Sequence, residues 1–259
     1  MAPEPSSKAA RREAARQEAK ALQEAQAKRD RRNRTIVVVA IVAALALIAV
    51  TVAVIVGQSS RSLLEDVERP DGSDLSGGIV AGAEGVGEPN EGAPVVRVYS
   101  DFLCSFCAAF EGLNGPVLDE LREAGSATVV YHPVGYLNSS SNGEYSTRAA
   151  QAMAVVADEA QEQFTAFWAA LFAVQPASTS IGLSDSEIAS VALGVGVPAE
   201  VVDTFPDGRF TEWVSAASDQ ATRDLPRPAT PTIIVDGVLF DGDWRDPETL
   251  RTAVLEAAA

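Results

Sequence analysis

The sequence predicts an α/β domain that follows a single N-terminal transmembrane helix. Three observations support this fold class. An uncharged, largely apolar stretch covers residues 35–57. From residue 94 onward, β-rich runs alternate with segments of helical periodicity. Two cysteines, Cys104 and Cys107, follow the first of those runs with the spacing Cys-x-x-Cys. The chain is therefore expected to join a membrane anchor to a domain with thiol chemistry.

The apolar stretch is long enough to cross a bilayer. Ile36–Val56 is interrupted only by Thr51, and as a helix it would extend about 31 Å, close to the thickness of about 30 Å of a hydrocarbon core. A cleaved signal peptide is the alternative, but its apolar region is normally about 7 to 15 residues long, and no Ala-x-Ala site follows here. The sequence favours an uncleaved, single-pass anchor in the cell membrane.

The balance of charge differs on the two sides of this stretch. Residues 1–34 contain ten Lys and Arg against five acidic residues, whereas the rest of the chain contains ten against thirty-one. Because basic residues flank the cytoplasmic end of a span, the basic tail 1–34 is expected in the cytoplasm and everything after residue 57 outside it. The acidic outer part argues against a nucleic-acid partner, whose phosphates need a basic face.

Residues 58–93 are rich in Gly, Ser, Asp, Glu and Pro, a composition that predicts a flexible extracytoplasmic linker. As a random coil, it would have a reach of about 30 to 35 Å. Residues 77–81 are expected to add a short edge strand. The linker would let a tethered domain sample the space near the membrane.

The folded domain is expected over residues 94–259, and it opens with a strand, a helix and a second strand. The strands are predicted at 95–99 and 127–134, and the helix between them covers 104–123. Two strands joined in this way form a right-handed βαβ unit. The cysteines are therefore expected at the carboxyl end of the first strand, which is the edge where α/β sheets usually carry chemistry.

A helical block is predicted as an insertion at about 144–224. An aromatic stripe in this block has helical spacing, and we interpret it as core rather than as an apolar groove for clients. The stripe consists of Phe164, Phe167, Trp168, Leu171 and Phe172. The chain then returns to a hairpin around Asp236-Gly237. A last helix is expected after Asp246, which can cap it.

Cys104 and Cys107 are the only cysteines in the chain. At a helix N-terminus, the first thiol receives free backbone N–H groups and the positive end of the helix dipole, which favours a nucleophilic thiolate. Half of a zinc site is one alternative, but the chain offers only one histidine, His132, as a further ligand. A structural disulfide is another, but so short a loop would constrain the unfolded chain little. Redox chemistry is favoured, no metal site is predicted, and His132 is interpreted as a structural strand residue.

Several motifs together resemble the DsbA-like branch of the thioredoxin superfamily. They are residues 100–107 with the cysteine pair, the strand end Tyr131-His-Pro, the helix start at Tyr145, and residues 229–237 with Thr-Pro-Thr. The resemblance covers about residues 78–259. It implies a thioredoxin-like fold with a helical insertion, in a membrane-anchored bacterial form of the actinobacterial type.

The resemblance also implies roles for single residues. Cys104 would be the attacking or attacked sulfur, and Cys107 would be its partner. Pro231 would match the cis-proline that faces the cysteine pair, leaving the backbone of Thr230 to pair with an extended client. The position six residues before the first cysteine, often a buried acid in relatives, is a valine here. Proton handling would then depend on another group, such as Asp101 or water.

The chain is expected to be a membrane-anchored, extracytoplasmic enzyme. It would act as a protein thiol-disulfide oxidoreductase that forms disulfide bonds in cysteine-containing exported proteins. The cysteine sulfurs would carry the electrons, so no cofactor is expected. The family implies re-oxidation by a quinone-linked membrane protein of the vitamin K epoxide reductase or DsbB type. A disulfide isomerase or reductase remains an alternative, as does a non-catalytic binding or chaperone protein of the cell envelope.

Overall fold

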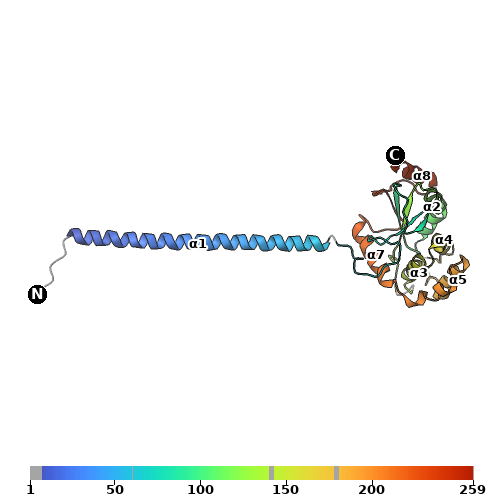
Figure 1. Cartoon of the computed structure of the whole chain (residues 1–259), viewed down its shortest axis with the longest axis horizontal. Helices are drawn as coiled ribbons and strands as arrows, with labels where there is room; N and C mark the ends of the chain where they lie inside the picture. The colour runs from blue at the N-terminus through green and yellow to red at the C-terminus, as the bar shows by residue number, and fades with distance from the viewer. Residues whose placement is uncertain (1–7, 60, 140–142, 178–180, 259) are drawn as a thin grey trace. The chain divides into compact units, whose positions relative to one another are not determined.

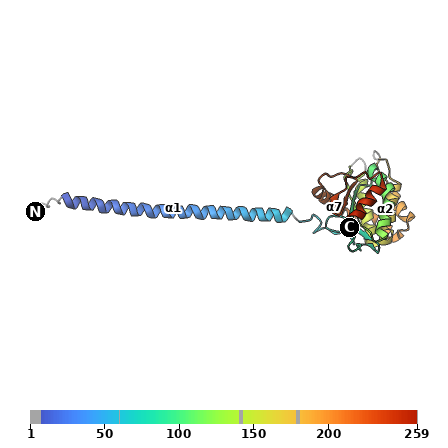
Figure 2. The ribbon, with the colours of Figure 1, turned by 90° about the horizontal axis from the view of Figure 1, so that it is seen from above.

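The computed structural model describes residues 8–59, 61–139, 143–177 and 181–258, and the first seven residues of the predicted tail lie outside this part. The chain divides into two compact units, with the boundary in the sequence between Arg61 and Ser62. The described part of the first unit is one helix, α1 (Lys8–Ser59), whose axis lies horizontally in Figures 1 and 2. By length and composition this helix could cross a membrane.

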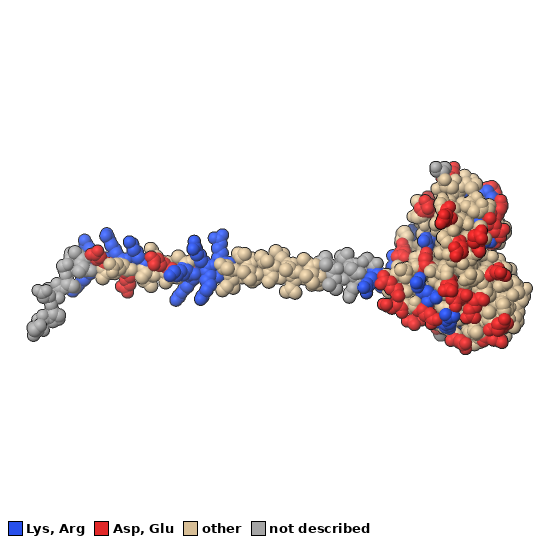
Figure 3. Space-filling model, viewed as in Figure 1, with Lys and Arg blue, Asp and Glu red and all other residues tan. Residues whose placement is uncertain are grey.

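The side chains of α1 support the predicted anchor. Lys and Arg gather in its N-terminal half and are followed by a stretch without charge (Figure 3). The large apolar side chains from Ile36 to Val50 are each more than half exposed. A continuous apolar surface of this kind is stable only against lipid or a partner. The second unit differs in charge from the basic N-terminal half of α1, because acidic side chains outnumber basic ones on its face shown in Figure 3.

The second unit is built on a six-stranded sheet with the order β2-β1-β4-β3-β5-β6. The strands are β1 (Ile79–Gly82), β2 (Gly85–Val86), β3 (Val95–Ser100), β4 (Thr128–Pro133), β5 (Thr232–Val235) and β6 (Val238–Leu239). Strands β3 and β4 are parallel and are joined by α2 (Ser105–Glu123), while the other neighbours are antiparallel. The predicted βαβ unit is confirmed. The strand expected at 77–81 is β1, which lies inside the sheet rather than at its edge.

The helical block lies between β4 and β5, as predicted. It contains α3 (Tyr145–Glu159), α4 (Phe164–Ala173), α5 (Asp185–Gly194), α6 (Ala199–Val202) and α7 (Thr211–Asp224), with short 3₁₀ turns η2 (Gln161–Gln163) and η3 (Phe205–Asp207). Figure 1 shows α3, α4 and α5 gathered together beside the sheet. The last helix, α8 (Pro247–Ala257), packs with α2, and Asp246 caps it as expected.

The aromatic stripe of α4 belongs to the core. Each of its five members is at most 5% exposed, so the core interpretation is confirmed. Two of them contact the loop that leads from β3 to α2: the ring of Phe102 stacks on Phe172 at 4.8 Å between centroids and meets Trp168 edge-on at 5.1 Å. The helical block therefore packs directly against the segment that carries the first cysteine.

The predicted flexible linker over 58–93 is wrong from Ser62 onward. Leu64 is fully buried, and the carboxylate of Asp74 accepts a hydrogen bond from Arg97 of β3 at 2.8 Å. This ion pair explains why a charged residue interrupts the apolar run of β3. Gly72, Gly77, Gly87 and Gly92 lie in turns or bends with positive φ, a conformation that favours glycine. The same composition is typical of linkers and of turns, and here it serves turns.

The packing of this segment gives a test by mutation. In the full chain in detergent micelles, Leu64→Ala is expected to lower the free energy of unfolding of the domain by about 2 to 5 kcal/mol, because it leaves a cavity in the core. Leu75→Ala is the matched control in the same segment, since Leu75 is 45% exposed, and it is expected to cost about 0.5 kcal/mol or less. Urea denaturation followed by tryptophan fluorescence measures both. Equal, small losses would mean that the segment is a linker after all.

Candidate redox site

Cys104 occupies the N-cap of α2, where the chain has just left β3. Its backbone is extended, with φ −81° and ψ 112°. An N-cap side chain usually accepts a hydrogen bond from the second or third N–H of the helix, and here these groups belong to Phe106 and Cys107. The thiol makes no full cap hydrogen bond, but both N–H groups lower the pKa of Cys104. The sulfur thus stands where a capping oxygen would be, and ionisation strengthens that role.

The two thiols, both free, have opposite proton affinities. Hydrogen bonding from Cys107 is the largest cause that lowers the pKa of Cys104, which falls to about 6, and the Thr230 hydroxyl contributes as well. Cys107 is fully buried. Burial, followed by the neighbouring Cys104 sulfur, raises the pKa of Cys107 far above its usual range. Near neutral pH the pair therefore consists of a thiolate at Cys104 and a thiol at Cys107.

Residues ahead of β5 complete the site. In the antiparallel pairing of β3 with β5, Tyr99 lies opposite Thr232, so the preceding residues reach the end of β3. The Thr230–Pro231 peptide bond is cis, and the Cys104 Sγ lies 3.4 Å from the Thr230 carbonyl oxygen, to which it donates when protonated. The structure thus brings Thr230 and Pro231 up to the cysteine pair, although they are more than 120 residues away in the sequence.

Asp101 is fully buried in the loop between β3 and α2. Its carboxylate accepts hydrogen bonds from the N–H groups of Leu103 and Leu137, each at 2.8 Å, and from the Ser146 hydroxyl at 2.6 Å. Burial raises the pKa of this carboxyl, and these hydrogen bonds oppose the rise. The contacts fix the shape of the loop. A role for Asp101 in proton transfer remains a proposal.

Two further polar residues lie around this loop. Gln175, just beyond α4, donates from Nε2 to the carbonyl oxygens of Phe102 and Cys104, each at 2.9 Å. Sequence reasoning missed it, because a single glutamine past the end of a helix carries no distinctive pattern. Ser146 falls within a motif that had been noted, but its bond to Asp101 joins residues 45 positions apart and could not be inferred.

His132 is structural, as interpreted from the sequence. Its ring stacks on that of Tyr99 with 4.0 Å between centroids. Burial lowers the pKa of His132 to about 3, so the ring is neutral at physiological pH. The Arg97 guanidinium lies 3.2 Å from its Nε2. The histidine is thus a buried, neutral side chain of β4 that packs between Tyr99 and Arg97.

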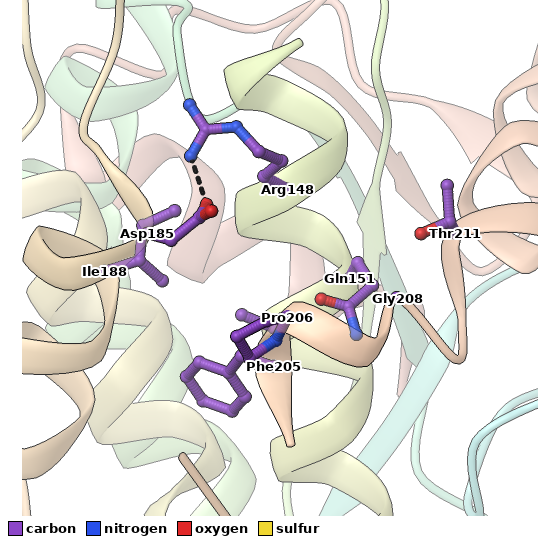
Figure 4. A pocket seen from close by; sticks show the side chains of 9 residues that line it. Arg148, Gln151, Asp185, Ile188, Phe205, Pro206, Gly208 and Thr211 are labelled. Atoms are coloured by element: carbon purple, nitrogen blue, oxygen red, sulfur yellow. Dashed lines mark hydrogen bonds and ion pairs between the residues drawn. The ribbon is translucent and has the colours of Figure 1, made fainter. Parts of the chain in front are cut away.

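A pocket of about 150 Å³ lies elsewhere, within the helical block. Figure 4 shows an ion pair between Arg148 and Asp185 on its wall, at 2.7 Å, with Gln151 from the same helix as Arg148. None of the predicted site residues lines it. Across the described ranges, no group of three or more His, Cys, Asp or Glu side chains is placed to hold a metal ion. The pocket is therefore separate from the cysteine pair.

Comparison with known proteins assigns the chain to a family. A family model described as Thioredoxin matches residues 85–256, and the chain belongs to this family. No curated protein matches the chain. The resemblance to DsbA-like proteins is confirmed by solved structures of similar fold.

Three of these structures come from actinobacteria. The reduced disulfide bond oxidoreductase DsbG of Mycobacterium tuberculosis is 34% identical with a TM-score of 0.58, and the match covers 64% of this chain and 78% of that one. DsbA of the same organism is 29% identical with a TM-score of 0.60, covering 70% and 93%. MdbA of Actinomyces oris, a thiol-disulfide oxidoreductase, is 26% identical with a TM-score of 0.62, covering 76% and 94%.

The unequal thiols predict a pH profile that depends on Cys107. Cys107→Ala removes the largest cause of the low pKa of Cys104, so this pKa is expected to rise from about 6 toward the ordinary value of about 8.5. Cys107→Ser keeps a hydroxyl donor, and most of the lowering is expected to remain. The rate of iodoacetamide alkylation against pH measures both variants, because only the thiolate reacts. The same midpoint in both would show that Cys107 does not stabilise the thiolate.

Proposed function

We propose that this chain is a membrane-anchored, extracytoplasmic thiol-disulfide oxidoreductase that forms disulfide bonds in cysteine-containing exported proteins. The observation that carries the proposal is the asymmetry of the cysteine pair, with a stabilised thiolate at the helix N-terminus and a buried, protonated partner. Proteins of similar structure are described as a disulfide bond oxidoreductase and a thiol-disulfide oxidoreductase, which supports the same class of reaction.

The proposed reaction starts from the Cys104–Cys107 disulfide. A client thiolate attacks the Cys104 sulfur, forming a mixed disulfide and releasing Cys107, which takes up a proton. A second client thiolate then attacks the client sulfur of the mixed disulfide and releases Cys104 as a thiolate. The client gains a disulfide, and the enzyme gains two electrons as a thiolate and a thiol. Stabilisation of the Cys104 thiolate favours this direction because it makes Cys104 a good leaving group.

The client would bind beside Cys104 in an extended conformation. We assign substrate binding to Thr230, whose backbone would pair with the client chain, and to Pro231 next to it. Phe106, between the two cysteines, is 59% exposed and would contact the same segment. Recognition through backbone groups and one apolar side chain fits an enzyme that acts on many unfolded clients.

Each catalytic cycle would leave the enzyme reduced, so it needs an oxidant from outside this chain. By analogy with the family, we propose a quinone-linked membrane protein of the vitamin K epoxide reductase or DsbB type. The anchor would keep the enzyme in the same membrane as such a partner. An isomerase or reductase would use the same two cysteines but would start from the reduced pair.

The two cysteine variants test the reaction. When a reduced peptide with two thiols is mixed with the oxidised full-length protein, its disulfide is expected to form at a rate proportional to the protein concentration. Cys104→Ser is expected to abolish this transfer. Cys107→Ser, presented with a disulfide-linked dimer of a peptide that has one cysteine, is expected to release one peptide as a thiol and to accumulate a mixed disulfide between the other and Cys104, because neither Cys107 nor a second thiol of the bound peptide can resolve it. Mass spectrometry of trapped samples measures both, and trapping by Cys104→Ser instead would reverse the assigned roles.

The proposed topology has its own test. Protease added to sealed, right-side-out cells is expected to digest the domain that follows residue 62 and to spare the tail 1–34, since only the domain lies outside. Antibodies against each end of the chain detect the two parts, and permeabilised cells are the control in which both are digested. A protected domain would place it in the cytoplasm.

A further inference from the structure

The helical block is tied to the redox loop by one side chain. Gln175 follows α4, and its backbone N–H still bonds to Phe172 at 3.2 Å, so the last turn of α4 holds its main chain. Its side-chain amide spans to the loop and donates to two carbonyl oxygens, those of Phe102 and Cys104, at 2.9 Å each. The stacking of Phe102 on Phe172 at 4.8 Å supports the same contact from the apolar side.

The two acceptors bracket the turn into α2. The Cys104 carbonyl also accepts the N–H of Cys107 at 2.9 Å and that of Ala108 at 3.2 Å, so it closes the first turn of the helix. The Phe102 carbonyl lies two residues earlier, in the loop itself. A donor that binds both oxygens therefore fixes the angle between the loop and the helix. That angle decides where the Cys104 sulfur lies relative to the N–H groups of the first turn.

We propose that Gln175 is a positioning residue of the redox site: by binding the carbonyl oxygens of Phe102 and Cys104, its amide holds the Cys104 sulfur against the N–H groups that open α2. This inference rests on the proposed function and adds to it a residue from the helical insertion. Asp101 holds the same loop through the N–H groups of Leu103 and Leu137, and Gln175 holds it through two carbonyl oxygens.

The charge of the side chain matters as well as its shape. The amide presents two N–H groups, and their partial positive charge faces the residue that carries the thiolate. A glutamate at this position would have nearly the same shape but would turn carboxylate oxygens toward two carbonyl oxygens. The other groups that set the thiolate at Cys104 are the Cys107 thiol, the Thr230 hydroxyl and the first N–H groups of α2, and all of them are neutral. None of these groups carries a charge that could offset a charge introduced at residue 175.

The test compares two amides with the same hydrogen bonding. Asn114 is the matched control, because its Nδ2 also donates to two backbone carbonyl oxygens, those of Phe110 and Trp244, at 3.2 and 2.8 Å. Gln175→Leu and Asn114→Leu each remove one amide in the full-length protein. Absorbance of the thiolate near 240 nm is followed against pH in the reduced form, and the reduction potential is measured in glutathione buffers.

Gln175→Leu is expected to reduce the ratio of thiolate to thiol at Cys104 about fivefold at pH 6, the effect of about one hydrogen bond. The same factor makes the reduction potential about 20 mV more negative. Gln175→Glu is expected to shift both quantities further in the same direction, because it replaces the donors by a negative charge. Asn114→Leu is expected to lower the melting temperature without moving either quantity.

Two results would overturn the inference. One is an unchanged thiolate titration in both Gln175 variants, and the other is an equal shift in Asn114→Leu, which would reveal a general loss of packing. Disulfide transfer to the reduced peptide is measured in parallel. If the proposed function is wrong, the wild-type protein transfers no disulfide. If only the role of Gln175 is wrong, the wild type still transfers disulfides, and the thiolate titration curves of the variants superimpose on the wild-type curve.

Discussion

The first turn of an α-helix has N–H groups without partners inside the helix, and in α2 these groups face a sulfur atom. The chain leaves β3 at Ser100 and enters α2 at Ser105, so Cys104 falls on the N-cap. An oxygen at this position would accept a hydrogen bond at any pH, whereas a thiol accepts well only after it loses its proton. The helix therefore stabilises one charge state of one residue. The remaining contacts of the site hold this geometry, through Asp101 on the inner side of the loop and the Thr230 segment across from the sulfur.

The difference between the two thiols follows from burial. Cys107 lies one turn into α2 and is completely covered, so ionising it would place a charge in an apolar interior, which is unfavourable. It donates to its neighbour instead, which stabilises the Cys104 thiolate further. Breaking the disulfide thus yields a stabilised thiolate and a stable thiol. Stabilising the reduced form in this way makes a couple more oxidising.

The sequence was sufficient where a local pattern has a local cause. A Cys-x-x-Cys pair after a β-rich run predicts cysteines at a helix N-terminus, and periodic apolar residues predict a buried α4. The sequence was not sufficient where the same amino-acid composition is compatible with two different structures. The glycines and aspartates between Ser62 and residue 93 fit a linker as well as turns, and the decisive partners lie far away, such as Arg97 for Asp74. Gln175 is the extreme case, since it binds residues more than 70 positions away through an amide that belongs to no periodic pattern.

The insertion of helices between β4 and β5 also has a chemical consequence. A thioredoxin-like sheet with one crossover helix already places two cysteines at its edge, and the inserted block contacts the loop before α2 through Phe172, Trp168 and the amide of Gln175. The environment of the nucleophile is thus built from three separate parts of the chain: the loop before α2, the end of α4 and the start of β5.

The reduction potential of the Cys104–Cys107 couple tests the account most directly. Full-length protein in detergent micelles is equilibrated in glutathione buffers of known ratio, and the free thiols are trapped and counted. A stabilised thiolate at the N-terminus of α2 predicts a couple more oxidising than thioredoxin, with a potential displaced from the thioredoxin value of about −270 mV toward the DsbA value of about −120 mV. A value near that of thioredoxin would contradict the account, because it would mean that the site does not stabilise the reduced pair.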